Sequence, residues 1–383
     1  MRFSEIAGHK EIIAALRDMA DSGRVPHALM LGGMPGIGKM RLARAFAQYL
    51  HCQARVDGDS CGRCPSCIQH QTLNNPDLHF AYPIVKIDSK PTLCSDWAPQ
   101  WREMLEQWSY MPPERWNELM NVGASQPRIF VTESEEIINR ATLSAYKEKL
   151  KIFIIWLPEL MQNETANKLL KIIEEPFSDT VFILVSNNDA AVLPTISSRT
   201  RRLNMLPLPE DEIASWLCEQ RGLDSREALA TARRAGGSIS KADQIACHPD
   251  ELKEFAEIFQ NLMRAAYGAR MQMLKKISET TAAFGRRKLI RFLEYCNSQV
   301  RENFIYNLRM PQLMQLSPDE EAFSQRFAPF IHAGNVEEMT EAFSVASRDV
   351  ERNCNAKIVM FDVAMILATL IRRPHSRPSS GAR

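Results

Sequence analysis

A glycine-rich stretch that ends in a lysine is the part of this sequence best suited to bind a phosphorylated ligand. The motif G-x-x-x-x-G-K fits from Gly33 to Lys39. Its glycines let backbone N–H groups turn onto a polyphosphate, and its lysine reaches the outer phosphates. The next position normally carries a hydroxyl that binds magnesium. Here it is Met40, whose thioether is a poor ligand for a hard cation. The sequence therefore predicts a loop that can hold phosphate but is badly equipped to hydrolyse it.

The stretches on either side of this loop are those that a phosphate-binding loop requires. The apolar run 28–31 predicts a buried parallel strand, and apolar residues then recur at helical spacing from 42 to 50. Strand, loop and helix in this order bring the N-terminus of the helix to the phosphate. A glycine-rich turn without a ligand is the alternative. The candidate nucleotide-binding residues of the loop are Gly33, Pro35, Gly36, Gly38, Lys39 and Met40.

Four cysteines with metal-ligand spacing form the second constellation. Cys61, Cys64 and Cys67 make two overlapping C-x2-C steps, and Cys52 lies nine residues upstream. Four thiolates suit a tetrahedral zinc ion, and a site with no open position is structural rather than catalytic. An iron–sulfur site would need a further cysteine where this chain has Gln71. Four unrelated free thiols are the alternative. The single cysteines elsewhere are predicted to fill cores: Cys94, Cys218, Cys247, Cys296 and Cys354.

A second part of an ATPase site is missing further along the chain. In a P-loop ATPase the strand at 152–155 would end in acids that hold magnesium. This chain reads Trp156-Leu157-Pro158 there. The next predicted strand, 181–185, ends in Ser186 and Asn187, whose polar side chains could sense a γ-phosphate, although strand ends are often polar. We therefore count Asn187 among the candidate nucleotide-binding residues.

Composition and length set the class of protein. The 383 residues are 45% hydrophobic and 24% charged, with a formal net charge of +1, which indicates a soluble globular protein of two or three domains. Balanced charge gives no sign of a nucleic-acid or membrane partner. The first residues lack a signal-peptide pattern, and the longest apolar run, 358–371, is shorter than the roughly 20 residues of a membrane span. We expect a cytoplasmic protein with reduced thiols.

The periodicity divides the chain into an α/β part followed by an all-α part. Residues 1–205 alternate between strand and helix patterns and include the four-cysteine module at 52–67. An insertion at about 83–127 carries four of the six tryptophans. It is either a short helical segment packed on the parent domain or a docking surface for a partner. A small helical domain is predicted at 206–247, a helical bundle at 248–373 and a disordered tail at 374–383.

These pieces, in this order, resemble the clamp-loader family of bacterial DNA polymerase III, an AAA+ group. The most specific match is residues 163–176 (NETANKLLKIIEEP) to the family's A-N-A-L-L-K-x-x-E-E-P block. Residues 193–199 (LPTISSR) resemble the family's L-x-P-T-I-x-S-R segment, residues 3–9 resemble the family's opening, and Asn353-Cys354-Asn355 resembles its C-terminal N-x-N. The insertion at about 83–127 is the main departure from the family's pattern. The resemblance implies an AAA+ P-loop parallel-sheet domain over 1–205, a helical lid over 206–247 and a collar over 248–373.

Within this family, gamma/tau subunits keep a complete ATPase site and delta-prime subunits have a degenerate one. This chain lacks the hydroxyl at Met40, the acids at Trp156 and Leu157, and a lid arginine, which is Ser240 here. The resemblance therefore implies a delta-prime-type scaffold with absent or very weak ATPase activity, and leaves the binding of ATP or ADP open. A gamma/tau-type ATPase is the first alternative. A zinc-dependent nucleic-acid-binding protein is the second, although only Arg55 and Arg63 are basic within the cysteine module.

Arg199 is the residue to which the resemblance assigns catalysis. It occupies the family's arginine-finger position, from which a planar cation reaches the ATP site of a neighbouring subunit. A surface arginine in a salt bridge is the alternative. The implied partners are the gamma/tau and delta subunits in a hetero-oligomeric ring and, indirectly, the sliding clamp and primer-template DNA, with no membrane. The implied process is sliding-clamp loading in DNA replication.

Overall fold

The computed structural model describes residues 1–383 except 88–91, 109, 122–124, 178, 309–317 and 374–383. The predicted disordered tail thus lies outside the described residues. The chain forms two compact units, Met1–Gln244 and Ile245–Arg383, which are treated separately below.

A five-stranded parallel sheet forms the centre of the first unit. Its order is β2-β3-β4-β1-β5, so that β1 lies between β4 and β5. The apolar runs of β1, β3 and β4 are buried along their whole length, as expected for parallel strands covered on both faces. The strands are β1 (Ala28–Gly32), β2 (Leu78–Ala81), β3 (Lys151–Trp156), β4 (Thr180–Val185) and β5 (Arg201–Asn204).

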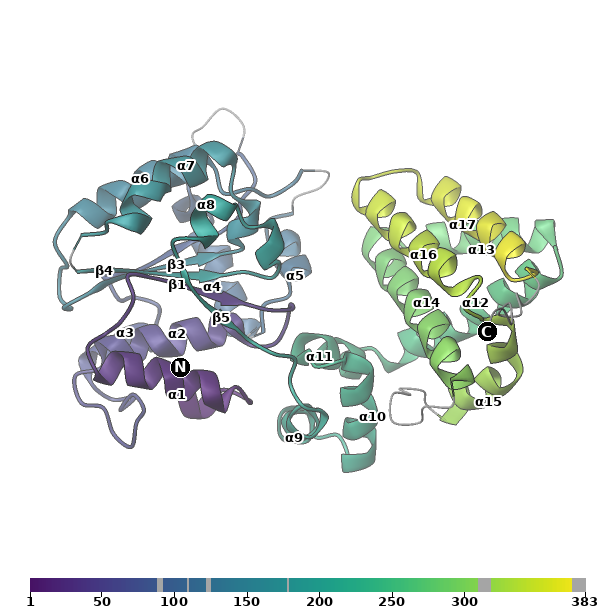
Figure 1. The fold of residues 1–383 in the computed structure, drawn as a ribbon, viewed down its shortest axis with the longest axis horizontal. Helices are drawn as coiled ribbons and strands as arrows, with labels where there is room; N and C mark the ends of the chain where they lie inside the picture. The colour runs from purple at the N-terminus through teal and green to yellow at the C-terminus, as the bar shows by residue number, and fades with distance from the viewer. Residues whose placement is uncertain (88–91, 109, 122–124, 178, 309–317, 374–383) are drawn as a thin grey trace, which may run out of the picture. The chain divides into compact units, whose positions relative to one another are not determined.

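Helices cover both faces of this sheet (Figure 1). On one face lie α1 (Lys10–Asp21) and α2 (Lys39–His51), and on the other lie α6 (Val131–Thr142) and α7 (Asn163–Glu174). The short apolar run 129–131 contributes no strand, because Ile129 makes only an isolated bridge with Met161 and Val131 begins α6. The shorter helices are η1 (Phe3–Glu5), α3 (Pro65–Gln71), η3 (Pro158–Leu160), η4 (Asp189–Ala191) and α8 (Pro194–Ser197).

The tryptophan-rich insertion packs on the parent domain. It forms η2 (Cys94–Trp97), α4 (Ala98–Gln107) and α5 (Pro113–Leu119). Trp101 stacks on Tyr82 with ring centroids 3.9 Å apart and lies 5.4 Å from Trp156 at the end of β3. Trp116 meets the same tyrosine edge-on at 5.1 Å. These buried rings extend the core of the sheet domain beyond the edge strand β2.

Three helices follow the sheet along the chain: α9 (Glu210–Arg221), α10 (Ser225–Ala235) and α11 (Ile239–Cys247). Ile213 and Leu217 are the buried residues of α9. The segment that enters these helices is fixed by a backbone hydrogen bond from the Leu208 N–H to the Gly237 carbonyl. We refer to residues 206–247 as the lid segment.

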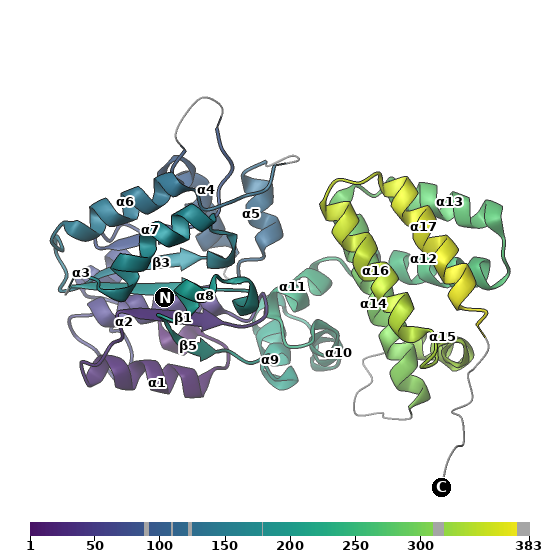
Figure 2. The ribbon, with the colours of Figure 1, turned by 45° about the horizontal axis from the view of Figure 1, so that its top comes forward.

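The described residues of the second unit form helices joined by turns and include no strand, which confirms the all-α prediction. Figure 2 shows its last two helices, α16 and α17, lying side by side. The apolar run 358–371 forms most of α17, whose buried side includes Val363, Ala364 and Leu367. No helix in the described ranges is long and apolar enough to cross a membrane. The helices are α12 (Pro249–Tyr267), α13 (Met271–Ala282), α14 (Arg286–Asn307), α15 (Pro318–Phe327), η6 (Ala328–Phe330), α16 (Val336–Glu351) and α17 (Ala356–Leu370).

Candidate nucleotide site and metal centre

The glycine-rich loop connects the carboxyl end of β1 to the N-terminus of α2, as predicted. Gly33, Gly36 and Gly38 have φ angles of 142°, 78° and 96°, which residues with a side chain rarely adopt. Gly38 is the N-cap of α2, so the loop delivers the chain directly to the free N–H groups of that helix. The backbone thus has the shape and polarity of an anion-binding turn.

Lys39 points back into its own loop. Its ammonium group donates hydrogen bonds to the carbonyl oxygens of Gly33, at 2.6 Å, and Met34. The residue is only 4% exposed, and burial lowers the pKa of the amine to about 8 against the opposing attraction of Glu159 and Asp189. Met40 is also buried and belongs to the hydrophobic core of the domain. The position that should carry a magnesium-binding hydroxyl therefore serves packing.

The lid segment contacts the apex of the loop. The Ser238 hydroxyl donates to the Pro35 carbonyl at 3.0 Å, and the Ser240 N–H donates to the Gly36 carbonyl at 3.3 Å. A Cβ atom at Gly36 would stand 1.9 Å from Oγ of Ser240, so only glycine fits beneath these serines. Ser240, which stands where the family resemblance places an arginine, meets the loop with a neutral hydroxyl group and no charge.

An acid that the sequence reading missed lies beside this loop. After β3 the chain turns through Leu157, whose φ is 55°, and brings Glu159 back to the end of β4. The Glu159 carboxylate accepts hydrogen bonds from the N–H of Asn187 at 2.8 Å and from the Ser186 hydroxyl at 3.0 Å. Burial raises the pKa of Glu159, and these donors oppose that effect. The structure places Asn187 here through its backbone, while Trp156 and Leu157 are buried in the core.

The four cysteines of the module come together as predicted. The sulfur atoms of Cys52, Cys61, Cys64 and Cys67 all lie within 4.8 Å of one another, and two of them, in Cys61 and Cys67, are 3.9 Å apart. Zinc–sulfur bonds of about 2.3 Å in a tetrahedron would place the sulfurs about 3.8 Å apart, so this set fits a zinc ion. Backbone N–H groups point at the sulfurs, from Cys61 to Cys52 and from Cys64 to Cys61, both at 3.3 Å. Such donors stabilise thiolates.

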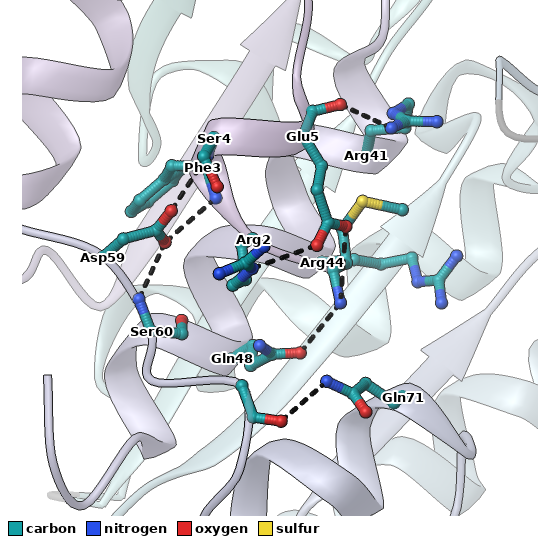
Figure 3. Close-up of polar contacts among 12 residues, drawn as sticks. Arg2, Phe3, Ser4, Glu5, Arg41, Arg44, Gln48, Asp59, Ser60 and Gln71 are labelled. Atoms are coloured by element: carbon teal, nitrogen blue, oxygen red, sulfur yellow. Dashed lines mark hydrogen bonds and ion pairs between the residues drawn. The ribbon is translucent and has the colours of Figure 1, made fainter. Parts of the chain in front are cut away.

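The cysteine module also holds the beginning of the described chain (Figure 3). The Asp59 carboxylate accepts hydrogen bonds from the N–H groups of Phe3 at 3.0 Å, Ser4 at 2.9 Å and Ser60 at 2.7 Å. Burial alone would raise the pKa of Asp59, but these three donors outweigh it and lower the pKa. The module thus fixes η1 through one charged side chain.

The same N-terminal segment is tied to the phosphate-loop helix. Within α2, Arg41 donates to the Glu5 carbonyl oxygen at 2.5 Å, and Gln48 accepts from the Met1 ammonium group at 3.0 Å (Figure 3). The cysteine module, η1 and α2 therefore form one connected polar network.

Arg199 lies just beyond α8 and is partly exposed. Its guanidinium donates to the Glu174 carboxylate at 2.7 Å and to the Thr195 carbonyl at 3.0 Å. Its side chain is 33% exposed and that of Glu174 is 55% exposed. A pair this exposed contributes about 0–1 kcal/mol to stability, so the arginine can leave it at little cost. The contacts that Arg199 makes in the described structure are with α7 and α8 and not with the phosphate loop.

Comparisons with known proteins point to subunits of DNA polymerase III. The profile of the family described as "DNA polymerase III, delta subunit" matches residues 8–209, which is just over half of the chain. The DNA polymerase III subunit gamma/tau of Mycobacterium bovis is 27% identical over 252 residues, covering 63% of this chain and 37% of the relative. The DNA polymerase III subunit delta' of Escherichia coli is 28% identical over 224 residues, covering 58% of this chain and 54% of the relative.

Among solved structures, the chain is similar to a DNA polymerase III gamma subunit-related protein from Thermotoga maritima. The two share 12% identity with a TM-score of 0.44, over 94% of this chain and 99% of that one. The chain aligns with about half or less of the length of the two relatives named above. The family profile covers the parallel-sheet domain that carries the phosphate loop. The chain therefore belongs to the clamp-loader family of bacterial DNA polymerase III.

Proposed function

We propose that this chain is a delta-prime-type clamp-loader subunit, a scaffold that does not turn over ATP itself. The observation that carries this proposal is the placement of Met40. The residue at the position of the magnesium-binding hydroxyl is a methionine. Its side chain is buried in the hydrophobic core and offers magnesium no oxygen ligand. Two further losses support it, the buried Trp156 and Leu157 at the end of β3 and the uncharged Ser240 against the loop.

In this proposal the chain's contribution to catalysis is Arg199, which acts on ATP held by a neighbouring subunit. Its exposed, weakly held ion pair with Glu174 leaves the guanidinium available to a partner. A planar cation next to the transferring phosphoryl group stabilises the charge that develops in the transition state. The division of the chain into a sheet domain, a lid segment and a helical collar suits this passive placement of one side chain.

The four cysteines are proposed to bind a structural zinc ion. They supply four thiolates and leave no ligand position for a substrate. When bound, the ion would lock the loop 52–67, and Asp59 in that loop fixes η1. Zinc in this position would thus support the segment that precedes the phosphate loop.

The partners that we propose are the other clamp-loader subunits, gamma/tau and delta, in a hetero-oligomeric ring. The helical second unit offers an apolar surface for such assembly on α17, where Ile358 is 69% exposed, with Phe361 and Ile366 also exposed. The sliding clamp and primer-template DNA would be met through the assembled ring. With no membrane partner, the chain would work in the cytoplasm.

A hydrolysing gamma/tau-type subunit is the second candidate, and Glu159 is the observation in its favour. This acid lies close enough to Lys39 to act on its charge. However, its carboxylate is already bound by the donors at the end of β4, which suits a structural brace better than a magnesium ligand.

ATP hydrolysis by the isolated chain separates the two candidates. We expect a rate no higher than that of a Lys39→Ala variant. Hydrolysis that is abolished by both Lys39→Ala and Glu159→Gln would establish the gamma/tau type. Mixing the chain with delta and gamma subunits should give a stable complex on gel filtration, and its failure to join them would reject membership of the ring.

A further inference from the structure

One residue of the insertion lies directly on the phosphate loop. Tyr110 follows α4, and its ring packs against Gly38, where a Cβ atom would stand 3.2 Å from Cε1 of the tyrosine. Tyr110 is itself only 9% exposed. The insertion, which has no counterpart in the family resemblance, therefore reaches the start of α2.

Side chains of α2 and the lid segment hold this ring in place. The guanidinium carbon of Arg41 lies 5.1 Å from the centre of the tyrosine ring, within cation–π distance. Trp216 of α9 meets the ring edge-on, with centroids 5.6 Å apart and planes at 83°. The insertion is also anchored to α2 by Arg44, which is 9% exposed and donates to the Leu105 carbonyl near the end of α4.

Side chains other than Tyr110 already cover further parts of the phosphate loop. Ser238 and Ser240 cover its apex, and the Asp189 carboxylate lies against Gly32, where a Cβ atom would stand 1.9 Å from the carboxylate. A phosphate bound at the N-terminus of α2 must reach the N–H groups of the first turn. The space beside Gly38 and Arg41 adjoins that first turn, and the ring of Tyr110 fills it.

We propose that Tyr110 is a specificity-determining residue of this site: it occupies the place of a nucleoside, so the loop takes a nucleotide only when the tyrosine withdraws. This inference rests on the proposed function, because a subunit that does not hydrolyse ATP can tolerate a closed site. Tyr110 would give a separate reason for weak nucleotide binding. Met40 and the missing acids impair magnesium binding and hydrolysis, but they leave the base and ribose free to bind. Apparent affinity for nucleotide is reduced by the fraction of molecules in which the tyrosine covers the loop.

The test is a titration of the full chain with ADP carrying a fluorescent ribose label, followed by anisotropy. Tyr110→Ala should bind at least about tenfold more tightly than the unmodified chain, because the covered state is removed. Tyr110→Phe keeps the ring and should behave like the unmodified chain. The gain should vanish in Tyr110→Ala combined with Lys39→Ala, which shows that the label binds at the loop. Equal or weaker binding by a folded Tyr110→Ala variant would overturn the proposal.

Trp216→Ala provides an independent variant in case Tyr110→Ala does not fold. Trp216 is only partly buried, and its removal frees one side of the tyrosine ring without changing the loop. Nucleotide should again bind more tightly, and an unchanged affinity would count against the proposal. Failure here is distinguishable from failure of the proposed function: if both variants bind no better while Arg199→Ala still slows the assembled complex, only the role of Tyr110 is rejected.

Discussion

Lys39 illustrates how the site differs from a working phosphate loop at the scale of single residues. Its amine is buried and donates to carbonyl oxygens of its own loop. A pKa near 8 in the folded chain is lower than that of an ordinary lysine in the unfolded chain, about 10.4. Between these values the unfolded state binds more protons, so the stability of the folded state due to this group rises with pH.

This gives a pH-dependent prediction for Lys39→Met. The free energy of unfolding of the unmodified chain, relative to that of the variant, should rise by roughly 2–3 kcal/mol between about pH 8 and pH 10.5. Urea denaturation at several pH values measures the difference. Lys149→Met, at an exposed lysine, serves as the control for the substitution itself. A flat difference for Lys39→Met would mean that the amine is not buried as described.

The sequence could locate residues whose neighbours are close in the chain, but not those placed by an unusual turn. Cys52, Cys61, Cys64 and Cys67 were identifiable because a metal knuckle is encoded in local spacing. Glu159 was not, because its approach to the end of β4 depends on a left-handed conformation at Leu157, the first residue after β3. An acid shortly after a strand is too common a signal to have identified it.

At the scale of elements, the cysteine module acts as a brace. It ties η1 to α2 through Asp59 and the N-terminal contacts, so loss of the proposed zinc ion should destabilise η1 and α2 as well as the loop 52–67.

We expect Cys64→Ser to lose zinc and to destabilise the first unit by about 4 kcal/mol or more, as losses of structural metals do. Metal content by mass spectrometry and the thermal midpoint measure the two effects. Cys247 was expected in a core but is exposed, so Cys247→Ser is the matched control and should retain both zinc and the thermal midpoint. Loss of zinc with an unchanged midpoint would show that the module does not brace the domain.

The central strands of the sheet could be predicted from the sequence, and the edge strands could not, because only the central strands are buried on both faces. β1, β3 and β4 are central and buried, so their continuous apolar runs were readable. β5 carries Arg201 and Arg202 on an edge, where charged residues are tolerated and no hydrophobic pattern is needed. β2 has only four residues. The run 129–131 has the composition of a strand but gains only one isolated bridge, from Ile129 to Met161, and Val131 already begins α6.

At the scale of the whole molecule, the second unit should serve assembly. Ile358 lies on the exposed side of α17, so Ile358→Glu should leave the fold intact, changing stability by less than about 1 kcal/mol, while weakening association with gamma and delta subunits at least about tenfold. Lys253→Glu on α12 is the control for charge, since Lys253 is also highly exposed. Analytical ultracentrifugation of the mixed subunits measures the effect. Full assembly of Ile358→Glu would place the contact surface elsewhere.

Tyr110 and its neighbours show why the nucleotide site could not be judged from motifs alone. The residues that cover the loop come from the insertion and the lid segment, more than 70 positions from Gly38, and local spacing does not encode such contacts. The phosphate-loop motif was correctly located, yet its surroundings decide what it can bind.

The role of Arg199 as an arginine finger is tested by ATP turnover in the reconstituted complex that contains Arg199→Ala. We predict normal assembly, a thermal midpoint close to that of the unmodified chain because the Glu174 pair is exposed, and turnover reduced by about 10³-fold at the neighbouring site. Glu174→Gln, which breaks the same ion pair but keeps the arginine, should retain turnover. Unchanged turnover by an assembled Arg199→Ala complex would show that Arg199 does not act on the neighbouring ATP site.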